Sequence, residues 1–305
     1  MKKILPILFP CALFASLFMS GGIDHDSKSS GMRGSDFAVI RSNNGFVLNP
    51  AKMAADQNDL YLYSTYTRYF SDVYLAGTQY IHPDLILKNQ STGFSIATIN
   101  YGEFVDYETG FTYTPYEMAL SFSQGYSINE IMAGINVHYI YSSITSDHRS
   151  SAFSSDIAFL YSFMDGNTVF GAGVFNVGFQ TDPYYRTRES VDPLIRTAVS
   201  YRIKNIPVTA TLQNDYNIGD PDKFNLMAGF ELEAKENLIV RLGYDSRGND
   251  WQIGDNNTSE KFGGLSLGAT ILISEMEFDF SYSLNGGLEN RFSMSAGIKL
   301  NKFIK

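Results

Sequence analysis

The sequence contains 305 residues, 44% of them hydrophobic and 14% aromatic, and carries a formal net charge of −9. This length suits one large all-β domain or two ordinary domains. The acidic balance argues against nucleic acid as a partner, because binding to phosphate needs clustered Lys and Arg.

The first 22 residues have the pattern of an export signal. Two lysines precede an apolar run over 4–19, and small residues follow up to Gly22. The pattern predicts a Sec signal peptide over 1–22 and therefore an exported protein. Cys11 would also suit a lipoprotein signal, but a proline precedes it and the apolar run continues past it. An uncleaved anchor is a further alternative, although the run is short for a membrane span.

Metal and cofactor chemistry has little support in the sequence. Cys11 is the only cysteine, so the chain without its leader has no thiol, disulfide or cysteine-bound metal. The four histidines follow no metal-binding spacing. We therefore predict neither a metal site nor a cofactor.

Residues 23–59 are expected to form a separate segment ahead of the strands. Proline restricts the residue before it and suits the first position of a helix, so the chain should turn at Asn49 and begin a short helix at Pro50. The preceding apolar residues, 46–48, are expected to pack this helix against a wall. The alternative is a simple linker turn.

From residue 60 to residue 300 the sequence alternates between apolar and polar side chains, which is the pattern of β-strands. Segments of roughly ten residues, the length that crosses a bilayer as a tilted strand, give about fourteen strands. The predicted strands are 60–69, 72–80, 92–101, 116–127, 130–142, 152–163, 167–178, 192–203, 206–216, 223–233, 236–246, 261–274, 275–285 and 289–300.

Short turns alternate with longer loops along most of this region, as in barrels with short periplasmic turns and long outer loops. No apolar run after the leader is long enough for a transmembrane helix. A soluble β-sandwich or propeller would also alternate, but the leader, the apolar face and the abundant Tyr and Phe favour a membrane barrel. The predicted fold is an all-β transmembrane antiparallel β-barrel of about 14 strands over 60–300, followed by a short tail, 301–305.

Both ends of the chain carry recognisable motifs. Residues 31–54 contain Gly31, Gly34 and an Asn-Pro-Ala sequence, and residues 262–300 contain GLSLG, an acidic alternating strand and a final RFS strand. These motifs resemble FadL-like outer-membrane proteins and, within that group, the PorV/PorQ family. Lys52 stands where those proteins often have glycine. The matching N-terminal residues are Gly31, Gly34, Ala38, Asn49, Pro50, Ala51 and Ala54.

The resemblance implies an outer-membrane barrel whose N-terminal segment folds into the lumen as a hatch or plug. For the PorV/PorQ family it implies a non-enzymatic role in type IX protein secretion or surface assembly, with secretion components or exported cargo as partners. For FadL it implies a channel for the uptake of hydrophobic compounds. Both functions place the barrel in outer-membrane lipid.

Charged residues on the polar face of the strands should point into the lumen. We expect them to pair with one another and with the plug, because an isolated buried charge is costly. A substrate pathway is the alternative. The candidate lumen residues are Arg196, Asp215, Glu231, Arg241, Glu277, Asp279, Arg291 and Lys299.

Three further lumen-facing residues permit an enzyme hypothesis. Ser121, His138 and Asp156 lie on successive predicted strands with the same parity. Approximate hairpin register places residue 121 near 136, so a Ser-His-Asp arrangement could form. Such residues are ordinary in a polar lumen, and a structural role is the preferred interpretation.

Two of the longer loops offer a contact surface. The segment 181–190 combines adjacent tyrosines with two arginines, a composition favoured at protein interfaces, and 245–260 contains the only tryptophan. The Asp and Asn residues around that tryptophan could also bind Ca²⁺ weakly, although a solvated loop is preferred. The candidate contact residues are Tyr184, Tyr185, Arg186, Arg188 and Trp251.

Overall fold

The structure, a computed structural model, describes a large part of the chain. The described residues are 26–40, 49–55, 59–86, 88–163, 166–184, 188, 193–218, 224–251, 262–286 and 289–302, with the main chain alone at 249–251.

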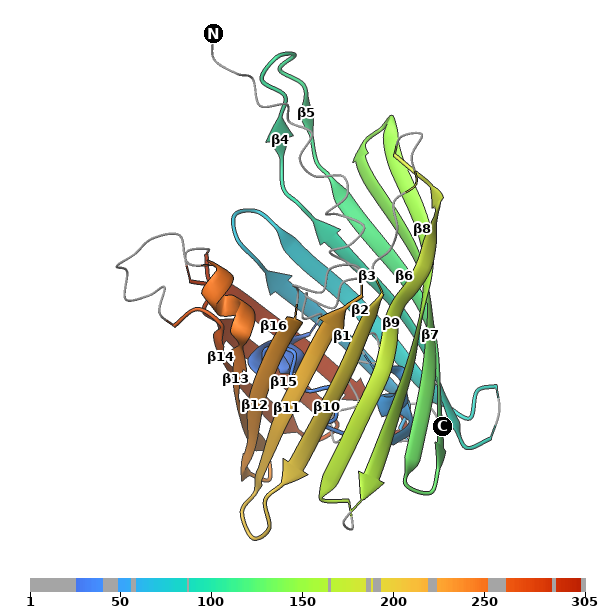
Figure 1. The fold of residues 1–305 in the computed structure, drawn as a ribbon, viewed down its shortest axis with the longest axis vertical. Coiled ribbons are helices and arrows are strands. Elements are labelled where there is room, and N and C mark those ends of the chain that lie inside the picture. The colour runs from blue at the N-terminus through green and yellow to red at the C-terminus, as the bar shows by residue number, and fades with distance from the viewer. Residues whose placement is uncertain are drawn as a thin grey trace.

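Within these residues, fourteen antiparallel strands form a closed barrel (Figure 1). The barrel closes where β1 (Tyr61–Arg68) pairs with β16 (Arg291–Lys299). The other barrel strands are β2 (Tyr74–Pro83), β3 (Gln90–Asn100), β6 (Tyr116–Ile128), β7 (Ile131–Thr145), β8 (His148–Phe163), β9 (Thr168–Asp182), β10 (Leu194–Arg202), β11 (Val208–Asn217), β12 (Phe224–Lys235), β13 (Leu238–Asp245), β14 (Leu265–Ile273) and β15 (Met276–Ser283).

The barrel confirms the predicted fold class, and each predicted strand corresponds to one barrel strand. The structure adds a hairpin, β4 (Phe104–Val105) with β5 (Thr112–Tyr113), in the connection between β3 and β6. This hairpin projects from the end of the barrel that bears the longer loops, opposite the short turns (Figure 1). We call these two ends the long-loop end and the short-turn end.

The side chains of the barrel are apolar outside and polar inside. On β15, Phe280 is 42% exposed on the outer face, whereas the neighbouring Asp279 is 1% exposed on the inner face. An apolar exterior around a polar lumen is the arrangement of a transmembrane barrel, in which every strand satisfies its backbone groups with its neighbours. Among the described residues, no helix combines the length and apolar character needed to cross a membrane.

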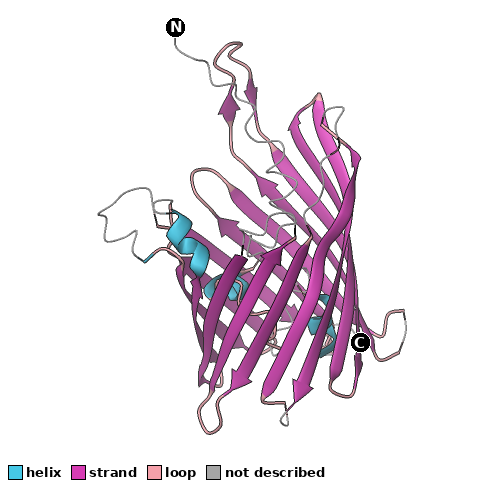
Figure 2. Cartoon of the chain, in the orientation of Figure 1, coloured by secondary structure: helices cyan, strands magenta, loops and turns pink. Residues whose placement is uncertain are grey.

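Two short helices precede the barrel strands in the chain and lie inside the ring of strands (Figure 2). They are α2 (Ser27–Gly31) and the 3-10 helix η1 (Pro50–Ala55). We call residues 26–40 and 49–55 the plug. A third helix, η2 (Ser246–Trp251), follows β13. The turn at Asn49 and the helix beginning at Pro50 were predicted, whereas α2 was not. The apolar residues 46–48 lie outside the described residues.

Candidate lumen site

Helix α2 is held in the lumen mainly by polar groups. The Asp26 carboxylate accepts a hydrogen bond from the Ser29 amide at 2.8 Å and so caps the helix. The Ser27 hydroxyl lies 2.9 Å from the Ser293 hydroxyl on β16, and the Ser27 amide donates to Ser295 at 3.1 Å. The helix therefore docks through hydroxyl groups that the sheet presents to the lumen.

Two glycines allow α2 to approach the wall closely. A Cβ atom at Gly31 would lie 2.9 Å from the Gly268 Cα on β14, a separation that no side chain tolerates without movement. The Gly31 carbonyl accepts a hydrogen bond from the Ser266 hydroxyl at 2.9 Å. Gly34 has a φ of +79°, which turns the chain away after the helix. Gly31 and Gly34 thus have physical roles in seating the plug.

Arg33 anchors the same end of the plug. Its Nε donates to the Gly264 carbonyl at 3.0 Å, and its Nη2 donates to the Leu284 carbonyl at 2.6 Å and to Asn285 Oδ1 at 3.0 Å. The side chain is fully buried. Sequence reasoning missed this residue, although a cation in a segment expected to enter the lumen was a signal for it.

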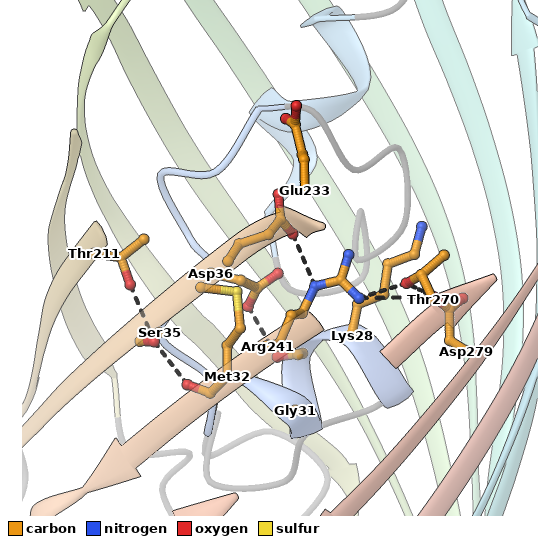
Figure 3. A network of polar contacts seen from close by, with 12 residues as sticks. Lys28, Gly31, Met32, Ser35, Asp36, Thr211, Glu233, Arg241, Thr270 and Asp279 are labelled. Carbon is orange, nitrogen blue, oxygen red and sulfur yellow. Dashed lines mark hydrogen bonds and ion pairs between the residues drawn. The ribbon is translucent and has the colours of Figure 1, made fainter. Parts of the chain in front are cut away.

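A cluster of charges lies beside α2, where the helix faces the barrel wall (Figure 3). Lys28 pairs with Glu277 at 2.7 Å, and Arg241 pairs with Glu231 at 2.8 Å. Arg241 Nη1 also lies 3.9 Å from Asp279. We call these five residues the charge cluster. Burial alone would lower the pKa of Lys28, but the charges of Asp279 and Glu277 outweigh burial and raise the pKa above its usual value.

The two parts of the plug are bonded to each other. Lys52 in η1 pairs with Asp36 at 2.6 Å, and Asn49 Nδ2 donates to the Phe37 carbonyl at 2.7 Å. Burial acts to raise the pKa of Asp36, but the charge and hydrogen bond of Lys52 hold it below its usual value. The lysine that replaces the common glycine after Asn-Pro-Ala therefore has a buried partner.

Arg196 connects the plug to β10 and β11. Its Nε and Nη2 atoms donate to the two Asp215 oxygens at 2.8 and 2.6 Å, in a bidentate pair. Its guanidinium also lies 5.8 Å from the centre of the Phe37 ring and 5.2 Å from that of Phe175. A plug aromatic thus packs on a charged pair of the wall.

Helix η1 occupies the opposite side of the lumen, where it packs on β3, β6, β7 and β8. Any Cβ atom at Gly134 on β7 would overlap the main chain of Pro50 and Ala51. Ala51 and Ala54 belong to a buried apolar cluster that also includes Phe37. Small residues on both surfaces allow this close contact.

Solved structures of other proteins share the fold of this barrel. Neither a protein-family model nor a curated protein matches the sequence. Among solved structures, the chain is similar to the CymD monoaromatic hydrocarbon channel, with a TM-score of 0.61, 11% identity, and coverage of 91% of this chain and 98% of that one. It has a FadL-like fold. The chain is also similar to the Pseudomonas putida toluene transporter TodX, with a TM-score of 0.60, 10% identity, and coverage of 91% of this chain and 97% of that one. For a Pseudomonas aeruginosa FadL homologue the TM-score is 0.58 and the identity 10%, with coverage of 90% of this chain and 98% of that one.

This FadL-like barrel does not bring all the candidate lumen charges together. Arg291 donates to the Ser283 hydroxyl at 3.4 Å and lies 5.5 Å from the centre of the Tyr69 ring, apart from the charge cluster. Lys299 pairs with Asp59 near the short-turn end and is half exposed. By contrast, Glu231 and Arg241, two of the candidate lumen charges, are directly paired on β12 and β13.

The candidate contact residues of the barrel's loops do not form one described surface. Tyr184 is half-buried, and its hydroxyl donates to Ser142 on β7. Arg188 is exposed. Tyr185 and Arg186 lie outside the described residues, and Trp251 ends η2 in a stretch where only the main chain is described.

The remaining candidates lie on the lumen face of the FadL-like barrel. Ser121, His138 and Asp156 form a continuous chain of hydrogen bonds across β6, β7 and β8. In the part of the chain that the structure describes, no group of three or more His, Cys, Asp or Glu side chains is placed to hold a metal ion.

Proposed function

We propose that the protein is an outer-membrane channel for the uptake of small hydrophobic compounds. The observation behind this proposal is a closed fourteen-stranded barrel whose lumen contains its own N-terminal plug. Proteins of the same fold include a monoaromatic hydrocarbon channel and a toluene transporter. The predicted signal peptide supports export to the outer membrane.

An apolar patch on the lumen wall supports a hydrophobic ligand. It consists of Leu75, Ala97, Ile99, Ala119 and Ile140, which form one buried cluster with Tyr69, Val73 and Tyr101 packed against it. We call it the mouth patch. Ala119 lies near the long-loop end of β6. Gly125, which faces η1, is six residues further along the same strand, so the two positions are about 20 Å apart. The patch therefore lies between the outer mouth and the plug, and apolar walls are typical of sites for small hydrophobic ligands.

Uptake of radiolabelled toluene by cells that express the barrel tests this proposal. We expect a higher initial rate than in cells with an empty vector. Ile140→Asp should reduce the added rate by about tenfold or more, because it places an uncompensated charge in the mouth patch. Ile140→Val keeps the patch apolar and is the matched control. Equal uptake with and without the barrel would contradict the proposal.

A role in type IX secretion or surface assembly is the second candidate. The sequence motifs at both ends favour it, and so does the β4–β5 hairpin, where Tyr107 is 93% exposed and Phe111 is also exposed. Exposed aromatic residues at the long-loop end suit a protein partner. Purification of the barrel from detergent extracts distinguishes the candidates: secretion proteins or exported cargo that remain bound favour this one, and bound apolar compounds without such partners favour the channel.

A further inference from the structure

A Ser-His-Asp chain crosses three neighbouring strands of the lumen wall. Ser121 on β6 lies directly opposite His138 on β7, and the Ser121 Oγ to His138 Nδ1 distance is 2.7 Å. The other ring nitrogen, Nε2, lies 2.8 Å from Asp156 Oδ2 on β8. Asp156 is displaced by two residues from the direct partner of His138, so the second contact is diagonal across the pair.

The hydrogen-bond acceptors determine which atoms of Ser121 and His138 carry the protons. An ionised carboxylate can only accept hydrogen bonds, so His138 must donate from Nε2 to Asp156. Nδ1 of the neutral ring is then an acceptor, and the Ser121 hydroxyl must donate to it. Asp156 is itself held by the Asn136 side-chain amide at 3.1 Å and by the Asn176 main-chain amide at 2.9 Å. The ring is thereby held in the tautomer that can remove a proton from Ser121.

Asn176 occupies an irregularity in β9 that brings its amide to Asp156. The β8–β9 pairing shifts between Ser155 and Ile157, and Asn176 has a φ of +61° in the left-handed region. Such bulges are frequent beside functional sites because they re-aim a side chain. Here the bulge directs a main-chain donor to the carboxylate that orients His138.

Spare hydrogen-bonding groups lie along this chain of hydrogen bonds: Ser123 is two residues from Ser121 on β6, Ser154 is opposite His138 on β8, and Asn176 is beside Asp156 on β9. The side chains of Ser123, Ser154 and Asn176 are each more than nine-tenths buried. Ser123 Oγ, Ser154 Oγ and Asn176 Nδ2 have no hydrogen-bond partner among the described residues. Buried polar groups are normally paired, so three unpaired groups on β6, β8 and β9, along the Ser-His-Asp chain, indicate a place for a polar ligand atom. In acyl transfer, a donor beside the nucleophile stabilises the oxyanion, and Ser123 is the one of the three that shares a strand with Ser121.

The place of the Ser-His-Asp residues in the lumen indicates the kind of substrate that could reach them. Ala119 and Ile140 of the mouth patch lie two residues from Ser121 and His138 on the same strands and face the same lumen. On the other side, Gly134 marks the contact with η1. Ser121 and His138 are largely buried, with 7% and 8% exposed, and lie on the lumen face between the apolar mouth patch and the plug.

We propose that Ser121, His138 and Asp156 form a nucleophilic serine site that hydrolyses carboxylic esters with a small apolar group. Ser121 Oγ attacks the carbonyl carbon while its proton passes to His138 Nδ1, and Asp156 stabilises the imidazolium. The C–O bond to the alcohol breaks, and His138 returns the proton to the leaving alcohol. Water then attacks the acyl-serine with His138 as base, releasing the acid and restoring the serine. This activity does not depend on transport through the barrel.

Labelling with a fluorophosphonate probe tests the site in the purified, full-length barrel. We expect covalent modification of Ser121, located by peptide mass spectrometry, together with hydrolysis of p-nitrophenyl butyrate. Ser121→Ala should abolish both, and His138→Gln and Asp156→Asn should each lower the hydrolysis rate by about a hundredfold or more. Ser281→Ala removes another buried, lumen-facing serine, from β15, and should leave both signals unchanged.

Each variant is checked for folding on gels, where a folded barrel changes its mobility when the sample is heated. A wild-type barrel that is folded but neither reacts with the probe nor hydrolyses the ester overturns the proposal, and this result needs no variant. Labelling of Ser121 at the same rate in His138→Gln would also overturn it, since the serine would then react without its base.

Discussion

Replacing Arg241 by Met is expected to lower the free energy of unfolding of the barrel by about 3–5 kcal/mol. Arg241 and Glu231 are paired at 2.8 Å with only 3% and 4% of their side chains exposed. The substitution would leave the Glu231 carboxylate buried without the cation it contacts. Asp279 would also lose the positive charge of Arg241, which lies 3.9 Å away. Removing one partner of a buried pair is costly because the remaining charge cannot be solvated. Glu231→Gln should lower stability for the same reason.

Arg202→Met is the matched control. Arg202 pairs with Glu233 at 2.8 Å, but their side chains are 28% and 29% exposed. Water can solvate the Glu233 carboxylate that remains after the change, so the loss should not exceed about 1 kcal/mol. Guanidinium titrations of barrels folded in lipid vesicles measure both values. Equal losses in the two variants would contradict the importance assigned to the charge cluster.

Deleting residues 26–55 is expected to raise the conductance of the barrel in a planar lipid bilayer by about tenfold or more. In the wild type, α2 packs on β13–β16 and η1 packs on β3 and β6–β8, so the plug occupies both sides of the lumen. Its removal leaves an interior lined by hydroxyl, amide and charged side chains, which water and ions can fill.

Deleting residues 104–113 is the control for this experiment. It removes the β4–β5 hairpin, which projects from the long-loop end (Figure 1). The truncated barrel should keep the low wild-type conductance. If the plug deletion folds but conducts no better than the wild type, the N-terminal segment is a linker rather than a seal.

The strands could be predicted because each has an apolar outer face and a polar inner face that repeat every two residues. The predictions failed where this pattern is missing. The strand β8 begins at His148, before its predicted start at residue 152, because residues 148–151 contain no apolar alternation. The hairpin β4–β5 has strands of two residues each, too short for any period.

Helix α2 illustrates a different limit. Its sequence, SKSSG, has no apolar face, yet all five residues are buried. A helix in a polar lumen is stabilised by hydroxyl and charged partners, so the hydrophobic periodicity used to find helices is absent. A helix of this kind can be predicted only when the residues that surround it are known.

The candidate site was predictable where hairpin register determines it. An error of only two residues separates the expected neighbour of residue 121, residue 136, from the observed partner, His138. Glu231 and Arg241, both expected in the lumen, are likewise direct partners across one hairpin. Contacts between the plug and the wall had no such guide. The Lys28–Glu277 pair joins residues 249 positions apart, and the sequence carries no register between them.

The most direct test of the account is a disulfide between the plug and the wall. Ser27→Cys with Ser293→Cys replaces two hydroxyls that lie 2.9 Å apart, a spacing compatible with a disulfide. Cys11, in the predicted leader, is the only native cysteine. Ser27→Cys with Ser142→Cys is the control, because β7 lies five strands from β16 around the barrel. Mild oxidation in intact membranes should link the first pair almost completely and leave the second pair reduced. If the first pair does not link, or links no better than the control, the N-terminal segment does not occupy the lumen.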